Sequence, residues 1–238
     1  MQRIFITGAG RGIGLEVTRQ YLQRGDRVVA GARSIERAPA LRQLQEQHRD
    51  LLTVVPVEVT DVASITAAVT QIHEYVEALD VLINNAAINS NDVFIDGPDG
   101  QQLLDASRPL EVLRVNAVAP IVVAQACMAL LRAGVNPRVV NISSGAGSLA
   151  QKSQGGDYSY AVSKTALNMF TRTFAFNAKA DGVTAIMIDP GWVKTDMGGP
   201  NARLEPMESA SGLLKVIDGL TPQDAGRFLR YDGSEVAW

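Results

Sequence analysis

Short apolar runs that suit β-strands alternate with longer amphipathic segments along the 238-residue chain. The first run, Arg3–Thr7, is rich in β-branched and aromatic residues and stops at Gly8. Apolar residues at helical spacing follow at once, through Ile13, Val17 and Tyr21. Strands that alternate with helices in this way form right-handed crossovers, which place the strands parallel in one sheet. We therefore predict an α/β fold of three layers, with a doubly wound parallel sheet of about seven strands.

The remaining elements are assigned from the same alternation. Further strands are predicted at residues 26–32, 51–59, 79–84, 135–143, 183–189 and 227–231. Helices are predicted at residues 35–47, 61–78, 109–133, 158–180 and 208–218, with Asp61 as an N-cap and Pro120 as a bend in the longest helix. No repeat, low-complexity tract or linker divides these elements. A single domain spanning residues 1–238 is therefore expected.

Composition narrows the classes of protein to which the chain can belong. Hydrophobic residues make up 46% and charged residues 20%, which is typical of a globular domain rather than a disordered one. The net charge of −3, without a block of like charges, weighs against nucleic acid or a membrane surface as a partner. The longest apolar stretch, residues 117–131, is shorter than the roughly 20 residues of a membrane span and contains Pro120 and Gln125.

The few cysteine and histidine residues limit redox and metal chemistry. The single cysteine, Cys127, cannot form an internal disulfide, and His48 and His73 are too few for a Cys/His metal cluster. The apolar start at residues 4–6 is too short for the core of a signal peptide. We therefore expect no metal and a reducing, cytoplasmic location.

A glycine-rich loop, Thr7-Gly8-Ala9-Gly10-Arg11-Gly12-Ile13-Gly14, joins the first strand to the first helix. Glycines allow a tight turn and a close approach of the backbone to a pyrophosphate, whose charge then meets the N–H groups of the helix. The spacing TGxxxGxG resembles the loop of the short-chain dehydrogenase/reductase family, whose members have a Rossmann fold. The cofactor-binding residues that this resemblance implies in the loop are Gly8, Gly10, Arg11, Gly12, Ile13 and Gly14.

The end of the second strand bears on the choice of cofactor. In a dinucleotide-binding fold this position faces the adenosine ribose, where an acidic residue binds a free 2′-hydroxyl and repels a 2′-phosphate. Ala32 stands where NAD-preferring members of the family carry Asp, and Arg33 follows it. Together with Arg11, this residue offers two guanidinium groups to a 2′-phosphate. We therefore predict NADP(H) as the cofactor.

The resemblance implies further cofactor contacts along the chain. Glu58 and Val59 align with the pair that contacts the adenine. Asn84 and Ala86 belong to a match with the family's Asn-Asn-Ala-Gly, in which Ala87 replaces the glycine; a methyl group is tolerated there if φ is negative. The segment implied to bind the nicotinamide follows the sixth strand and contains Pro190, Gly191, Val193 and Thr195.

The pair Tyr160 and Lys164 matches the YxxxK motif of the family. Residues i and i+4 share a face of a helix, so the ammonium group is expected near the phenol, where its charge would lower the phenol pKa from about 10. Tyr160 can then act as general acid in carbonyl reduction and as base in alcohol oxidation. Tyr158 has Val162 rather than a lysine four residues on, and is interpreted as a pocket or packing residue.

Two more residues complete the catalytic set that the resemblance implies. Ser144, which follows Ser143, is expected to hold the substrate oxygen and to stabilise the negative charge that develops there. Asn116 aligns with a family asparagine whose backbone holds a water in a proton relay from the lysine. Ser144 and Tyr160 are 16 residues apart (160 − 144), a few more than is usual in the family. The extra residues, 151–157, are predicted to bulge outward as a polar loop.

Together these motifs predict an NADP(H)-dependent carbonyl reductase or alcohol dehydrogenase that acts on a small ketone, aldehyde or quinone, or on the corresponding alcohol. Residues 144–151, 191–200 and 232–238 resemble the C-factor and sniffer carbonyl-reductase branch, so a cofactor-binding signalling protein of C-factor type is the alternative. A methyltransferase on a similar fold would leave the YxxxK pair and the two arginines unexplained. Residues 198–206 are expected to form a substrate lid, and the two longest helices to support a homodimer or homotetramer.

Overall fold

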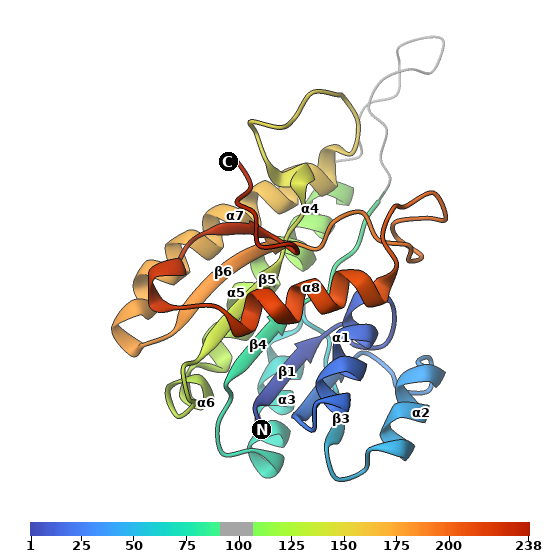
Figure 1. Cartoon of the computed structure of the whole chain (residues 1–238), viewed down its shortest axis with the longest axis vertical. Coiled ribbons are helices and arrows are strands. Elements are labelled where there is room, and N and C mark those ends of the chain that lie inside the picture. The colour runs from blue at the N-terminus through green and yellow to red at the C-terminus, as the bar shows by residue number, and fades with distance from the viewer. Residues whose placement is uncertain (91–106) are drawn as a thin grey trace.

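The computed structural model of the chain describes residues 1–90 and 107–238. Its centre is a seven-stranded sheet in the order β3-β2-β1-β4-β5-β6-β7, in which all neighbouring strands are parallel (Figure 1). The strands are β1 (Arg3–Thr7), β2 (Arg27–Ala32), β3 (Leu52–Pro56), β4 (Val81–Asn84), β5 (Arg138–Ile142), β6 (Thr184–Asp189) and β7 (Phe228–Arg230). From the central strand β1 the next two strands are added on one side, in the order β2 and β3. The strands β4 to β7 are then added in order on the other side, so the predicted doubly wound sheet is confirmed.

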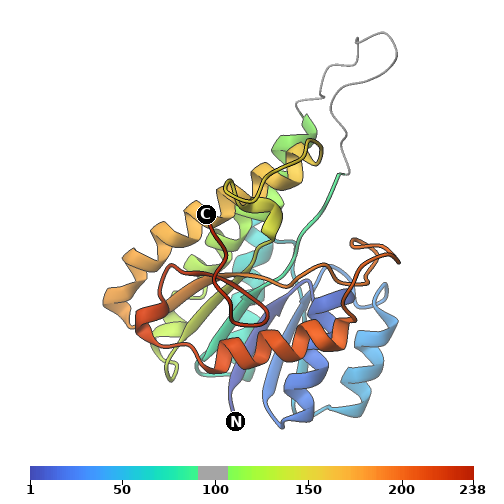
Figure 2. The same cartoon turned by 45° about the horizontal axis from the view of Figure 1, so that its top comes forward.

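Helices cover both faces of the sheet (Figure 2). One face carries α1 (Gly12–Gln23), α2 (Pro39–Gln47) and α8 (Pro206–Asp218); the other carries α3 (Val62–Tyr75), α4 (Ser107–Leu113), α5 (Ala119–Ala126), α6 (Met128–Arg132) and α7 (Tyr158–Ala178). Successive strand residues point to opposite faces, so Ile4 joins one apolar core with Leu41 of α2, whereas Phe5 joins the other with Ile72 of α3. These two cores separate the three layers that the sequence predicts.

The segment predicted as one helix at residues 109–133 is interrupted. It begins as α4, passes through a π-helical turn at Arg114–Val118, resumes as α5 with Pro120 in the first turn, and breaks at Cys127 before α6. Proline has no N–H, so the carbonyl of Asn116, four residues earlier, lacks its α-helical donor. A π-helical turn accommodates this missing hydrogen bond and lets the helix continue. The prediction of a continuous helix is therefore wrong.

Two other predicted boundaries are corrected, both at a proline. The helix α2 begins at Pro39 rather than at residue 35, because proline is favoured in the first helical turn and biases the residue before it away from helix. The strand β3 ends at Pro56 rather than at residue 59, because proline cannot donate a hydrogen bond to a strand ladder. The other predicted ends lie within three residues of the observed ones, and Asp61 caps α3 by accepting a hydrogen bond from the N–H of Ala63.

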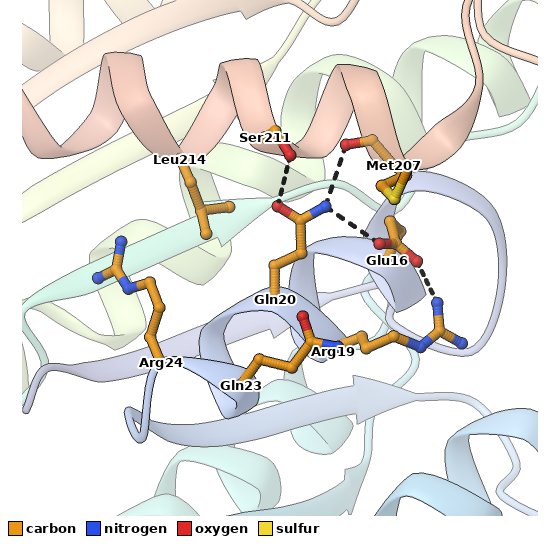
Figure 3. Close-up of a pocket in the computed structure, with 8 residues that line it drawn as sticks. All are labelled: Glu16, Arg19, Gln20, Gln23, Arg24, Met207, Ser211 and Leu214. Carbon is orange, nitrogen blue, oxygen red and sulfur yellow. Dashed lines mark hydrogen bonds and ion pairs between the residues drawn. The ribbon is translucent and has the colours of Figure 1, made fainter.

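The helices α1 and α8 are joined through polar side chains (Figure 3). Gln20 of α1 donates from Nε2 to the carbonyl of Met207 (3.0 Å) and to the carboxylate of Glu16 (3.0 Å). Its Oε1 accepts a hydrogen bond from Ser211 (3.1 Å). These residues line a surface hollow in which the guanidinium of Arg19 is paired with Glu16. The contacts hold α8 against α1, which follows the glycine loop directly.

One stretch among the described residues, Ser107–Ala126, is long and apolar enough to cross a membrane by length and composition alone. In the structure it comprises α4, the π-turn and α5. Its side chains Val112, Ala117 and Val123 are buried in the helical layer beside α7. Leu110 and Val118 of the same stretch are exposed, so packing within the domain accounts for only part of its apolar composition.

The amino-terminal edge of the sheet is held by Asp80, which directly precedes β4. Its carboxylate accepts hydrogen bonds from the backbone N–H groups of Arg3 (2.8 Å) and Val135 (2.7 Å), and pairs with the Arg3 guanidinium at 2.7 Å. Burial by itself raises the pKa of this carboxyl, but the hydrogen bonds outweigh burial and hold the pKa below its ordinary value. Ionised Asp80 therefore joins β1 to the segment that precedes β5.

We expect Asp80→Ala to lower the free energy of unfolding by about 2–4 kcal/mol, because two backbone N–H groups and a guanidinium lose their acceptor. Since the pKa of Asp80 is lower in the folded state, its ionised carboxylate contributes fully to folding stability above the unfolded-state pKa of about 3.9. This contribution is lost as pH falls through the lower folded-state pKa. Urea unfolding at neutral pH measures the change. The control is Asp181→Ala, which breaks an exposed pair with Arg132 and should leave stability nearly unchanged; equal losses would contradict the prediction.

Candidate active site

The carboxyl ends of the parallel strands bring the predicted site residues to one edge of the sheet. There β1 leads into the glycine loop, β4 into residues 85–87, β5 into Ser143 and Ser144, and β6 into Pro190. In open α/β sheets, ligands bind at this edge beside the point where the strand order reverses, which here lies between β1 and β4. The fold therefore places the candidate active site at this edge.

The glycine loop has a backbone that only glycine adopts easily. Gly8 (φ +67°) and Gly12 (φ +56°) lie in the left-handed region. A side chain at Gly14 is excluded, because its Cβ would lie 2.4 Å from Nδ2 of Asn85 and 2.5 Å from the carbonyl oxygen of Gly8. The helix α1 begins at Gly12 with no side-chain cap and no acidic residue in its first turn, so its N-terminal N–H groups are available to an anion. The loop thus fits a pyrophosphate.

Asn85 supports the glycine loop, a role that sequence reasoning missed. Its Nδ2 donates to the carbonyls of Gly8 (3.0 Å) and Thr7 (3.2 Å). The hydroxyl of Thr7 in turn accepts from the backbone N–H groups of Asn85 (3.1 Å) and Ala86 (3.2 Å). The segment after β4 therefore holds the loop after β1. The motif contained Asn85, but only the structure shows which backbone atoms it reaches.

The side chain of Asn84, a predicted cofactor contact, points into the domain. Its Nδ2 donates to the carbonyl of Pro120 (3.0 Å) and to Oδ1 of Asn141 (2.8 Å), and the residue is buried. The side chain joins β4 to β5 and α5, so its observed contacts are structural. Ala87 is not among the described residues with positive φ, and its methyl group is therefore tolerated as expected.

The two arginines predicted to bind a 2′-phosphate lie near one corner of the site and differ in their surroundings. Arg11 pairs with Asp196 at 2.9 Å, and both side chains are exposed. Arg33 directly follows β2 and is exposed. A Cβ at Gly10 would lie 4.0 Å from Cβ of Ala32, so the glycine loop adjoins the end of β2. An anion at this corner would compete with Asp196 for Arg11.

Glu58 and Val59 lie beyond the end of β3, in the loop that leads to α3. The Glu58 carboxylate accepts hydrogen bonds from the backbone N–H (3.1 Å) and the hydroxyl (2.8 Å) of Thr60. The backbone N–H of Glu58 donates to Ser64 (2.9 Å). The carboxylate thus orders its own loop, and the contact of this pair with adenine stays a prediction.

The side chain of Ser144 lies close enough to the phenol of Tyr160 to influence its pKa, although the interval between the two residues is longer than usual. Ser144 caps the 3₁₀ turn Gly145–Gly147, and its Oγ accepts from the N–H of Ala146 (3.1 Å). Most of residues 151–157 are exposed and form the yellow loop that projects outward at the top of Figure 1. The extra residues therefore bulge outward as predicted, and the two catalytic candidates stay together.

Burial governs the protonation of Tyr160. It raises the pKa of the phenol to about 12, and the negative charges of Asp189 and Asp157 act in the same direction. The side chain of Ser144 lowers the pKa of the phenol, but this influence is outweighed. The expectation that the lysine lowers this pKa is therefore wrong for the protein by itself, because desolvation is the largest contribution and Lys164 is not among the groups that shift the pKa.

Lys164 lies on the same helical face as Tyr160, as the YxxxK spacing predicts. Its Nζ is 5.6 Å from the centre of the Tyr160 ring and donates to the carbonyl of Ile142 (2.7 Å). Burial lowers the pKa of Lys164 to about 7. Near neutral pH the lysine is therefore divided between its charged and neutral forms, whereas the phenol keeps its proton.

Asn116 lies buried in the π-turn and fastens that turn to its neighbours. Its Nδ2 donates to the carbonyl of Ile88 (2.8 Å) and to the hydroxyl of Ser163 (3.0 Å), while its Oδ1 accepts from the N–H of Ile88 (2.9 Å). Because Ser163 directly precedes Lys164, this contact brings Asn116 beside the YxxxK helix. The water relay through its backbone stays a prediction.

The segment predicted to bind the nicotinamide packs against the glycine loop. Gly191 (φ +79°) turns the chain after β6, and Val193 is buried. The hydroxyl of Thr195 accepts from the N–H of Gly198 (3.1 Å), and its Cγ2 would lie 3.3 Å from a Cβ placed on Gly12. This close approach brings the predicted pyrophosphate and nicotinamide segments together.

The neighbouring residues anchor that segment to α8 and to the predicted lid. The carbonyl of Pro190 accepts a hydrogen bond from Ser209 (2.7 Å), which lies on α8. Residues 198–206 return along the segment, where Leu204 bridges to Val193 and accepts from the N–H of Lys194 (2.9 Å). The movement of this stretch as a lid stays a prediction.

The family comparison agrees with this geometry. A model of the short chain dehydrogenase family matches residues 2–205. The chain belongs to this family. The match includes the glycine loop, the Tyr160–Lys164 pair and the turn after β6, so this short-chain dehydrogenase is an oxidoreductase by family.

Three relatives indicate its branch. The C-signal protein of Myxococcus xanthus is 41% identical over 160 residues, which cover 67% of this chain and 93% of that protein. The NADPH-bound carbonyl reductase from chicken fatty liver has a TM-score of 0.90 and 35% identity, over 100% of this chain and 99% of that one. The carbonyl reductase Sniffer of D. melanogaster has a TM-score of 0.93 and 29% identity over 100% of both chains. This short-chain dehydrogenase is thus of the C-factor and sniffer-like type.

We expect Lys164→Met to stabilise this short-chain dehydrogenase, and to do so more strongly at lower pH. Because the pKa of Lys164 is lowered in the folded state, its positive charge destabilises the fold. This loss of stability is absent at pH values above the unfolded-state pKa of about 10.4 and is fully present below about pH 7. The gain of the variant over wild type should therefore grow by roughly 1–3 kcal/mol between about pH 9 and pH 6. Urea unfolding of both proteins at the two pH values measures it.

Lys152→Met is the matched control, since Lys152 lies in the exposed loop before α7. This variant should show no comparable growth in stability toward low pH. The same pH dependence in both variants would contradict the assignment of the effect to the buried ammonium.

Proposed function

We propose that this short-chain dehydrogenase is an NADP(H)-dependent reductase of ketones, aldehydes or quinones, which also catalyses the reverse oxidation of alcohols. The observation that carries the proposal is the placement of Lys164 at the carboxyl edge of the sheet: its Nζ lies 5.6 Å from the centre of the Tyr160 ring and donates to the carbonyl of Ile142 at the end of β5, two residues before Ser144. Bound at the glycine loop, NADPH would supply the hydride. The carbonyl reductases among the solved relatives, one of them NADPH-bound, support this choice.

Each catalytic side chain has its own role in this proposal. Ser144 donates a hydrogen bond to the carbonyl oxygen and stabilises the negative charge that develops there. Tyr160, protonated at neutral pH, gives its phenolic proton to the same oxygen as the alcohol forms. Lys164 would hold the nicotinamide ribose when the cofactor is bound and, when protonated, stabilises the phenolate that remains. Asn116 keeps the π-turn beside α7 and holds the water through which the lysine exchanges protons with solvent.

NADPH should bind more tightly than NADH, because Arg11 and Arg33 can each form a charge-assisted contact with the 2′-phosphate. Each contact is worth roughly 1.5–3 kcal/mol, so Arg33→Ala should weaken NADPH binding about tenfold or more and leave NADH binding unchanged. Calorimetric titration with both cofactors measures the effect. Arg49→Ala, at an exposed arginine before β3, is the control. Equal affinity of the wild type for the two cofactors would refute the preference.

Tyr160→Phe should lower turnover by at least about 10²-fold, the scale expected for loss of a general acid, while folding and NADPH binding persist. Tyr158→Phe is the matched control, because it removes a phenol two residues away that has Val162 rather than a lysine on its face; its effect should fall mainly on KM. Steady-state kinetics with NADPH and a panel of aldehydes, ketones and quinones measures both. An inactive Tyr158→Phe beside an active Tyr160→Phe would overturn the assignment, and two fully active variants would overturn the mechanism.

A cofactor-binding signalling protein is the second candidate, because the chain is 41% identical to C-signal over 160 residues. The convergence of Ser144, Tyr160 and Lys164 weighs against binding alone, which has no need of a general acid. Tight NADPH binding without turnover of any carbonyl in the panel would favour the signalling role.

Assembly and location stay predictions. The side chains of Val162, Met169 and Phe176 are more than half exposed along α7, which makes this helix available for the expected homodimer or homotetramer. In the same proposal residues 198–206 close over the substrate, and the protein acts in the cytoplasm.

A further inference from the structure

Three adjacent strands end side by side at the catalytic edge, and each contributes a polar side chain. The N–H of Ser143, just after β5, donates to the carbonyl of Ile188 in β6, which places Ser144 next to the end of that strand. Asp189, the last residue of β6, pairs in register with Arg230, the last residue of β7. A serine, a carboxylate and a guanidinium therefore follow one another across the edge.

The carboxylate of Asp189 lies between two turns of the candidate site. Its Oδ1 accepts from the N–H of Gly191 (3.0 Å), in the predicted nicotinamide segment. Its Oδ2 would be 3.3 Å from a Cβ placed on Gly145, the residue after Ser144, and it accepts from Nε of Arg230 (3.3 Å). The Asp189 side chain is 9% exposed and that of Arg230 is 37% exposed, so the guanidinium reaches inward from the surface to a buried anion.

We propose that Asp189, held and partly neutralised by Arg230, is a positioning residue that controls through its charge how readily Tyr160 gives up and regains its proton. A buried negative charge near the phenol opposes formation of phenolate. It thereby keeps Tyr160 in the acid form that carbonyl reduction uses, and Arg230 limits the effect. The inference rests on the proposed function and extends it to two residues outside the catalytic set.

Other charged and polar groups also act on the phenol of Tyr160, and the influence of Asp189 has to be compared with theirs. Lys164 faces the phenol ring from the next turn of α7. Asp157, just before α7, acts on the phenol in the same direction as Asp189, and the side chain of Ser144, after the end of β5, acts in the opposite direction. Asp189 is distinguished from Asp157 by its burial and by the guanidinium that Arg230 brings to it.

The two members of the ion pair should have opposite effects on the phenol. Asp189→Asn keeps an acceptor for Gly191 and removes the negative charge, so phenolate should form at lower pH. Arg230→Gln removes the neutralising cation, so phenolate should form at higher pH. A merely structural bridge predicts otherwise, because either variant breaks the same contact and should then disturb the site in the same direction.

The measurement is the pH profile of kcat for oxidation of an accepted alcohol with NADP⁺, a reaction that needs the phenolate. We expect the alkaline rise in rate to move to lower pH by about half to one unit in Asp189→Asn, and to higher pH by a similar amount in Arg230→Gln. Arg230→Lys should restore the wild-type profile. The control is Arg227→Gln, which breaks a pair with Asp224 just before β7 and should leave the profile unchanged.

Shifts of both variants in one direction, or no shift in either, would overturn the proposal. Titration of tyrosinate absorbance, taken as the difference between each variant and the same variant carrying Tyr160→Phe, follows the phenol without turnover. If no carbonyl is reduced but the titrations still move in opposite directions, the proposed reaction fails and the inference about the ion pair stands. If turnover occurs and the titrations coincide, the inference alone fails.

Discussion

Parallel pairing of the strands is the constraint on which the site depends. The register places Thr7 of β1 beside Asn84 of β4, and Asn84 beside Asn141 of β5. The chain leaves each of these strands at the same edge, so loops far apart in sequence become neighbours there. This is why Asn85 can hold the carbonyl of Gly8, and why the serine after β5 meets a tyrosine on a later helix.

A series of hydrogen bonds between buried side chains links strands β4 and β5 to helix α7. Asn84 donates to Asn141 (2.8 Å), Asn141 donates to Thr171 (2.7 Å), and Thr171 donates to the carbonyl of Leu167 within the helix (2.7 Å). Polar groups in such surroundings are costly unless they are paired, and when paired they favour one arrangement over others. The helix that presents Tyr160 and Lys164 is thus fixed to the sheet by directional contacts as well as by its apolar face.

The electrostatics of the site oppose the charged forms of its own catalytic groups. Burial raises the pKa of Tyr160 to about 12 and lowers that of Lys164 to about 7. Groups placed in this way destabilise the fold when charged, a pattern expected where a site is arranged for chemistry rather than for stability. The carboxylate of Asp189 and the guanidinium of Arg230 extend the same electrostatic environment across two more strands.

The sequence by itself determined the α/β class, the seven parallel strands, the glycine loop and the pairing of Tyr160 with Lys164. These follow from local rules: the period of apolar residues, the conformational freedom of glycine, and the i, i+4 spacing of one helix face. The end of β3 at Pro56 and the π-turn before Pro120 are also local effects, but they depend on single backbone hydrogen bonds that periodicity does not resolve. Contacts between distant segments were decided only by the tertiary structure.

Three such contacts concern the site directly: the pairing of Arg11 with Asp196, the inward orientation of Asn84, and the place of Asp189 between two turns. The pKa of Tyr160 belongs with them, because the spacing of the motif puts a lysine near the phenol but does not show how much water the fold removes from it. Distance and burial are properties of the packed chain. They raise the pKa of Tyr160, whereas the motif alone predicts that it is lowered.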